Sequence, residues 1–231
     1  MNKVIENLNS IKEKIKKVPE KFHIKEIKPP EIIAVSKTFG GEHIIPLLEH
    51  GHVHYGENRV QEALSKWPEL KKRFPNTKLH LIGPLQTNKI KEALEVFDVI
   101  HTVDREKLAV KLKEEMEKQK TNLPVFIQVN TGEEEQKAGI TPKEADGFIK
   151  FCKELRLNVI GLMCIPPIDE EPSFHFALLK KIVERNNLTN LSMGMSSDYE
   201  KAAALGSTHL RIGSLIFGER EYKEKNDQAG S

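Results

Sequence analysis

Eight short apolar, β-rich segments recur along the 231-residue chain, and segments with helical periodicity lie between them. The clearest helix start is at Thr141, an N-cap that is followed by Pro142 at the first helical position and by the capping-box acid Glu144. Strands that alternate with helices and are mostly apolar throughout form a parallel sheet covered on both faces. The eight predicted strands span residues 31–36, 52–56, 78–83, 98–103, 124–130, 158–165, 189–194 and 208–213.

Eight is also the number of strands that closes a (β/α)8 barrel, and about 250 residues is the usual size of that fold. We therefore predict one TIM-type barrel domain over residues 1–231. An open, doubly wound sheet is the alternative. No glycine-rich dinucleotide fingerprint follows the first predicted strand, which disfavours that alternative.

The two ends of the chain differ from the barrel repeat. Apolar residues at helical spacing predict an extra amphipathic helix over residues 3–18. Residues 1–29 are therefore expected to hold this helix and its connection to the first strand. The polar stretch 221–231 is expected to be a frayed tail.

Charge and composition exclude several classes of protein. The 36 basic and 34 acidic side chains are mixed along the chain, whereas nucleic-acid and membrane-surface proteins need a concentrated basic face. The longest apolar runs are strand-sized, and the first twenty residues lack the apolar core of a signal peptide, so we expect a cytoplasmic protein. Cys152 and Cys164 fit no metal spacing or disulfide framework and are expected to be buried thiols.

The residue that follows the first strand is a lysine, Lys37. Barrels build their chemistry at the carboxyl ends of the strands. Desolvation at the edge of an apolar barrel favours the neutral form of an amine, and the neutral amine attacks carbonyl groups. A lysine that reaches out to solvent is the alternative, but the nearby glycine pair Gly40 and Gly41 favours a functional lysine.

The loops after the seventh and eighth strands are where barrels commonly bind phosphate. Here they hold Ser196 and Ser197, and then Gly213 and Ser214. Backbone N–H groups at a helix start bind anions, and a glycine lets the backbone approach them closely. Either loop alone could be an ordinary N-cap or turn. Together with Lys37 on the strand next to the eighth, they predict a phosphorylated carbonyl compound held as an imine.

Arg211 lies in the last strand, two residues before Gly213, so both residues face the same side of the strand. An arginine at such a place needs a buried acceptor. The pyridine nitrogen of pyridoxal 5′-phosphate (PLP) is one candidate acceptor, because PLP sites pair a Schiff-base lysine with an Asp or Arg at that nitrogen. An internal ion pair with Glu57 or another barrel carboxylate is the alternative.

Histidines invite a metal hypothesis. His52 and His54 alternate onto one face of a strand, as in barrel metallohydrolases, and His80, His101 and His209 could add ligands. However, these residues fall in the first half or the middle of their strands, whereas the open site of a barrel lies at the strand ends. We therefore expect no metal site.

Six motifs in order closely resemble the pyridoxal phosphate homeostasis protein family over residues 30–220. They read AVSKT, YGENRVQE, HLIGPLQTNK, NVIGLMCI, LSMGMSSDYEKA and LRIGSLIFGER. The resemblance implies a single barrel similar to the N-terminal domain of alanine racemase, without the second, β-rich domain of the racemase. Leu79 departs from the family pattern, in which an aromatic residue is common at this position.

The resemblance also implies roles for individual residues. Lys37 would form the Schiff base with PLP, Asn58 would lie near this lysine, and Arg211 would face the pyridine nitrogen. The phosphate would be held at four positions, namely Ser196, Ser197, Gly213 and Ser214.

Two functions fit this site. An arginine at the pyridine nitrogen weakens the ring as an electron sink, and a racemase would need a second acid or base on the opposite ring face. We therefore expect a monomeric carrier or regulator of PLP with little catalytic turnover and with apo-PLP enzymes as partners. This expectation agrees with the vitamin B6 role that the resemblance implies. A PLP-dependent amino-acid racemase is the alternative, with Tyr55, a bound water or another group as its second base.

Overall fold

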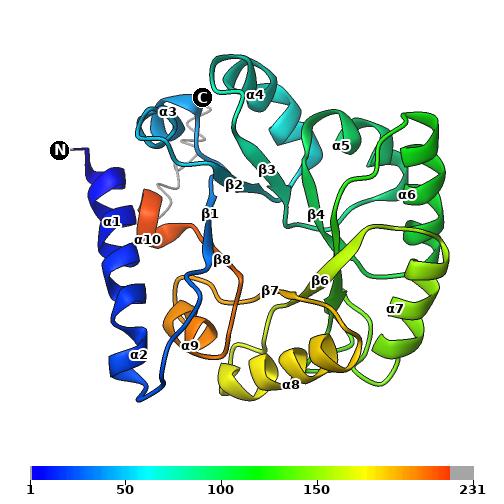
Figure 1. Ribbon diagram of the computed structural model, residues 1–231. Coiled ribbons are helices and arrows are strands. Elements are labelled where there is room, and N and C mark those ends of the chain that lie inside the picture. Colours follow the sequence, from blue (N-terminus) through cyan, green and yellow to red (C-terminus); the bar gives the residue numbers. More distant parts are fainter. Residues whose placement is uncertain (1, 219–231) are drawn as a thin grey trace, which may run out of the picture.

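The computed structural model describes residues 2–218, and in that part of the chain eight parallel strands close into a barrel (Figure 1). Neighbours in the barrel follow the chain order, and β8 pairs with β1. The predicted barrel and its eight strands are thus confirmed, while the predicted tail 221–231 lies outside the described residues. The strands are β1 (Glu31–Val35), β2 (His54–Glu57), β3 (Lys78–Leu81), β4 (Val99–Val103), β5 (Val125–Val129), β6 (Val159–Cys164), β7 (Asn190–Ser192) and β8 (His209–Ile212).

Helices surround the barrel and bury their apolar faces against it (Figure 1). None of the helices in residues 2–218 combines the length and the apolar character needed to cross a bilayer. The helices are α1 (Lys3–Lys16), α2 (Val18–Lys21), α3 (Gly41–Glu49), α4 (Val60–Arg73), the 3-10 helix η1 (Thr87–Lys89), α5 (Ile90–Val96), α6 (Glu106–Lys118), α7 (Ala145–Glu154), α8 (Pro172–Arg185), α9 (Tyr199–Ala204) and α10 (Ser214–Phe217).

The N-terminal segment forms two helices where the sequence predicted one. Pro19 lies in the first turn of α2 and has no N–H group to continue the hydrogen-bond ladder of α1. α1 packs on the barrel through Leu8, Ile11 and Ile15 and contacts α10, where the side-chain amide of Asn7 donates to a backbone carbonyl oxygen. This helix therefore covers the place where the last strand meets the first.

The start of α7 lies three residues beyond its predicted position. Thr141 and Glu144 form the reciprocal hydrogen bonds of a capping box, with 2.7 Å between Thr141 Oγ1 and Glu144 Oε2. The residues between them form a turn, however, and the helix proper begins at Ala145. The prediction that this helix starts at Pro142 is therefore wrong, although its side-chain interactions are present.

Barrel closure brings the two ends of the strand sequence together. Ile33 pairs with Arg211 and Ala34 pairs with Ile212, so β1 and β8 run side by side. Because parallel strands end at the same edge of the barrel, the loop after β1 lies beside the loop after β8. This placement makes a site built from both loops possible.

Candidate functional site

A cavity of about 770 Å³ lies at the carboxyl ends of the strands. All seven cofactor-binding residues predicted from the sequence line this cavity, although they come from four strand ends. They are Lys37, Asn58, Ser196, Ser197, Arg211, Gly213 and Ser214.

The turn after β1 holds Lys37 at the cavity wall. The preceding residue, Ser36, is fully buried, and its N–H group donates to the carbonyl oxygen of Gly56 on β2 at 3.0 Å. The following residue, Thr38, has a φ of +70°, a left-handed conformation that β-branched residues seldom adopt. Its N–H group donates to Glu62 of α4. The half-buried Lys37 is thus framed by contacts to two neighbouring elements.

A buried ion pair between α4 and the end of β2 supports the turn that holds Lys37. Lys66 Nζ on α4 lies 2.7 Å from Glu57 Oε1 at the end of β2, and it donates to the carbonyl oxygens of Ser36 at 2.9 Å and of Phe39 at 3.0 Å. Glu57 is completely buried and also accepts from Ser36 Oγ and from Trp67 Nε1. Burial raises the pKa of Glu57, and Lys66 counteracts this shift.

The motifs in the sequence did not point to Lys66 as a supporting residue. Lys66 lies three residues after the buried Ala63 and next to the buried Trp67, so it borders the apolar face of α4. A lysine at the edge of a helix face that packs on a barrel, close in sequence to a strand-end acid, was the available signal.

Replacing Lys66 with methionine is expected to lower the free energy of unfolding by about 3–5 kcal/mol, because it leaves the Glu57 carboxylate buried without its cation. Urea unfolding of the purified protein measures this loss. Lys72 on the same helix is a matched control, since it pairs with Glu69 but is 71% exposed. Lys72→Met should change the stability by no more than about 0.5 kcal/mol. Equal losses for the two variants would contradict the role given to Lys66.

Arg211 lies almost fully buried inside the barrel wall, with 4% of its surface exposed. Its Nη1 donates to Ser192 Oγ and its Nη2 donates to the carbonyl oxygen of Cys164, both at 2.8 Å. Burial lowers the pKa of Arg211. The alternative of an ion pair with Glu57 is not found: Glu57 pairs with Lys66, and Arg211 forms no ion pair within residues 2–218.

The loop after β7 presents backbone donors. The N–H groups of Ser196 and Ser197 donate to no other group in the described part of the chain. The turn is held by Asp198, whose carboxylate accepts from the N–H group of Met195 at 2.6 Å. Gly194 enters the turn at a φ of +93°, and a Cβ there would lie 2.5 Å from the Cβ of Ala202. Only glycine fits at this position.

Asn58 brings a side-chain amide to the cavity from the end of β2. Its Oδ1 is buried and has no hydrogen-bond partner within residues 2–218. The backbone of Asn58 packs tightly on Gly83, where an added Cβ would lie 2.2 Å from the Asn58 carbonyl oxygen. Gly83 therefore has a reason to be glycine that the sequence alone did not reveal.

The remaining candidate groups lie away from the cavity. Tyr55 is fully buried and packs on Trp67, with ring centroids 5.0 Å apart, and it does not line the cavity. Cys152 and Cys164 are buried free thiols, as predicted, and burial raises the pKa of both to about 12. Within residues 2–218, no group of three or more His, Cys, Asp or Glu side chains is arranged to hold a metal ion.

Comparison with known proteins shows which family this chain resembles. The sequence model described as "Alanine racemase, N-terminal domain" matches residues 7–221. A pyridoxal phosphate homeostasis protein of Vibrio alginolyticus is 37% identical over 232 residues, which cover 93% of this chain and 100% of that protein. The protein of the same name from Aquifex aeolicus is 37% identical over 227 residues, covering 94% of this chain and 98% of that protein.

Solved structures of related proteins have the same fold as this chain. The PLP-bound structure of PipY from Synechococcus elongatus matches with a TM-score of 0.76 and 32% identity, covering 88% of this chain and 100% of that chain. An alanine racemase from Clostridium difficile matches with a TM-score of 0.72, but it is only 16% identical and this chain spans 58% of it, so that likeness shows the fold alone. The chain belongs to the pyridoxal phosphate homeostasis proteins, within the family defined by the N-terminal domain of alanine racemase.

Proposed function

We propose that this protein binds PLP in the cavity at the carboxyl ends of the strands and acts as a carrier or regulator in intracellular PLP homeostasis. The observation that carries this proposal is the convergence of three features on one cavity: an amine, a buried guanidinium, and backbone N–H groups that have no acceptor within residues 2–218. The PLP found in the structure of the related PipY supports it.

The residues around the cavity fit the functional groups of PLP. PLP supplies an aldehyde that bonds covalently to an amine and a pyridine ring that withdraws electrons. Lys37 is the amine that we assign to the aldehyde, and Arg211 is the donor that we assign to the ring nitrogen. Asn58, whose Oδ1 has no hydrogen-bond partner among the described residues, is placed to bind a polar substituent near the lysine.

We assign the phosphate to the loops after β7 and β8. The N–H groups of Ser196 and Ser197, which have no acceptor in the described part of the chain, can donate to phosphate oxygens together with the hydroxyls of these residues. Gly213 has no side chain to obstruct the approach of the anion, and the hydroxyl of Ser214 lies in the same cavity wall.

The same geometry favours a carrier over a racemase. Arginine can only donate hydrogen bonds, so Arg211 would leave the pyridine nitrogen unprotonated and the ring a poor electron sink. A racemase also needs a second proton-transferring group, and neither Tyr55 nor Tyr199 lines the cavity. Burial raises the pKa of both tyrosines, which disfavours the phenolate that a base requires.

Incubation of the PLP-loaded protein with individual L-amino acids in deuterated water tests this proposal. We expect slow α-proton exchange or none, together with transfer of PLP to an added apo-enzyme that depends on PLP. A Lys37→Ala sample carried through the same steps controls for exchange caused by free PLP. Racemisation at about 1 s⁻¹ or faster would overturn the carrier function in favour of the racemase.

The proposal also covers the localisation, the oligomeric state and the partners of the protein. We infer a cytoplasmic monomer whose partners are PLP and apo-PLP enzymes. The two buried free thiols, Cys152 and Cys164, support this setting, because free cysteines persist in a reducing compartment.

A further inference from the structure

A continuous chain of hydrogen bonds runs through the barrel interior from Arg211. The hydroxyl of Ser192 on β7 accepts from Arg211 Nη1 at 2.8 Å and lies 2.9 Å from His101 Nδ1 on β4. His101 Nε2 lies 2.9 Å from His80 Nδ1 on β3. His80 Nε2 lies 2.9 Å from His54 Nδ1 on β2. Side chains from five strands are therefore joined in one line.

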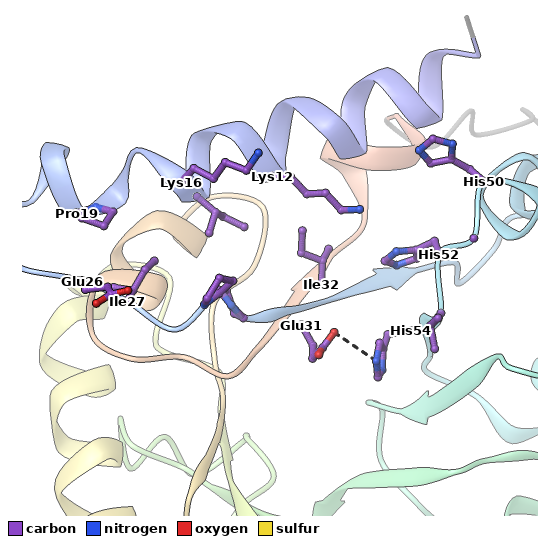
Figure 2. A pocket seen from close by; sticks show the side chains of 15 residues that line it. Lys12, Lys16, Pro19, Glu26, Ile27, Glu31, Ile32, His50, His52 and His54 are labelled. Carbon is purple, nitrogen blue, oxygen red and sulfur yellow. Dashed lines mark ion pairs between the residues drawn. The ribbon is translucent and has the colours of Figure 1, made fainter.

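The far end of this chain reaches a second cavity. His54 Nε2 lies 3.4 Å from Glu31 Oε2, at the start of β1. Both residues line a cavity of about 780 Å³ at the amino ends of β1 and β2, into which Lys12 of α1 also points (Figure 2). Arg211 lines the first cavity and Glu31 the second, so the chain connects opposite ends of the barrel.

Burial favours the neutral form of the imidazoles in this chain. His80 and His101 are buried, with 1% and 0% of their surfaces exposed, and burial lowers the pKa of both well below the usual value. Burial lowers the pKa of His54 as well. A neutral imidazole carries one donor and one acceptor, so each ring can receive one hydrogen bond and give one. The ring of His101 is further held by stacking on Phe126, with centroids 4.2 Å apart.

The two ends of the chain determine the position of every proton in it. Arg211 can only donate, so the Ser192 oxygen accepts from it, and within residues 2–218 the Ser192 hydroxyl has no acceptor other than His101 Nδ1. His101 must then carry its proton on Nε2 and donate to His80. By the same reasoning, His80 donates from Nε2 to His54.

Glu31 at the other end agrees with this direction. If His54 accepts from His80 at Nδ1, its proton is on Nε2, the atom that lies 3.4 Å from Glu31 Oε2. An ionised carboxylate can only accept. A donor-only group and an acceptor-only group thus enclose four groups that can do both, and a single proton arrangement satisfies all of them.

We propose that this chain holds Arg211 in position for the cofactor and makes Ser192, His101 and His80 positioning residues of the PLP site. The inference rests on the proposed PLP function. Arg211 is a buried guanidinium without an ion pair in the described part of the chain, so its neutral acceptors must be strong and well oriented. Each hydroxyl or imidazole that donates down the chain becomes a better acceptor, because hydrogen bonds in series polarise one another.

The arrangement of protons can be measured without any cofactor. In PLP-free protein labelled with ¹⁵N in its histidine rings, long-range ¹H–¹⁵N correlation spectra distinguish the two neutral tautomers. We expect the Nε2–H tautomer for His54, His80 and His101. The Nδ1–H tautomer or a charged ring at His80 or His101 would overturn the inference. This result does not depend on whether the protein binds PLP.

Variants of the chain test whether it affects the binding and the absorption of PLP. Ser192→Ala and His101→Leu are each expected to weaken PLP binding about 10-fold or more, because they break hydrogen bonds that lead to a buried charge. They should also shift the absorption maximum of bound PLP, which loss of packing alone would not move. Ser192→Thr keeps the hydroxyl and should restore both properties.

His209→Leu is the matched control. His209 lies beside the chain, with its ring centroid 6.0 Å from that of His101, but its Nδ1 contacts Thr208 Oγ1 instead of the chain. This variant should keep the native affinity and absorption. Native behaviour of His101→Leu, or equal changes in His209→Leu, would contradict the inference. Absence of PLP binding in the unmodified protein would refute the proposed function and leave the tautomer result standing.

Discussion

Lys37→Ala is expected to abolish the covalent imine and to weaken PLP binding about 100-fold or more, which corresponds to about 2.7 kcal/mol. The alanine has no amine to bond to the aldehyde, and only the contacts to the ring and the phosphate remain. Equilibrium dialysis gives the affinity, and the visible absorption of the imine reports the covalent bond.

Two further variants separate the chemistry of Lys37 from its charge and from lysine in general. Lys37→Arg keeps a positive charge but should also lose the imine absorption. Lys201→Ala removes a lysine close to the β7 loop, whose amine pairs with Glu171 at 2.8 Å, and should bind PLP normally. An imine that persists in Lys37→Ala would show that another lysine holds the cofactor.

Gly213→Val is expected to weaken the binding of PLP about 100-fold and that of unphosphorylated pyridoxal only a few-fold, because only the phosphate meets this loop. A Cβ at Gly213 would already lie 3.3 Å from the carbonyl oxygen of Val35, so the two added methyl groups have little room except toward the cavity. Titrations with both ligands, followed by absorption, measure the two affinities.

A smaller change in the neighbouring loop gives a graded comparison. Ser197→Ala removes one hydroxyl but keeps the backbone N–H group, so it should weaken PLP binding less than Gly213→Val does. It should leave pyridoxal binding nearly unchanged. Equal losses for PLP and pyridoxal in either variant would remove the phosphate from these loops.

The fold was predictable from the sequence because the barrel repeat is local. Each strand is a short apolar run, each crossover has helical periodicity, and these patterns require no knowledge of distant contacts. The exact start of α7 was not predictable in the same way. Thr141 and Glu144 make the same capping hydrogen bonds around a turn as they would around a first helical turn, so the motif does not determine where the helix begins.

The candidate site was predictable only where it follows from strand ends. Lys37 and Arg211 could be placed at one edge of the barrel because closure makes β1 and β8 neighbours. The support of Lys37 by Lys66 and Glu57 depends on how α4 packs, and that packing is not encoded in spacing along the chain.

Contacts among the histidines were also not predictable from spacing along the chain. Alternation predicted that His52 and His54 share one face of a strand, but it could not reveal which rings meet across strands. The register between β2, β3 and β4 brings His54, His80 and His101 into hydrogen-bond distance. Three of the histidines that suggested a metal site thus form a chain of hydrogen-bonded imidazoles.

Peptide mapping after borohydride reduction shows directly which lysine bonds to PLP. Reduction of the native PLP-loaded protein converts the imine into a stable bond, and proteolysis with mass spectrometry then locates the modified lysine. We predict a single phosphopyridoxyl group, carried by the peptide that contains Lys37. A modification on another lysine, or one spread over several surface lysines, would contradict it.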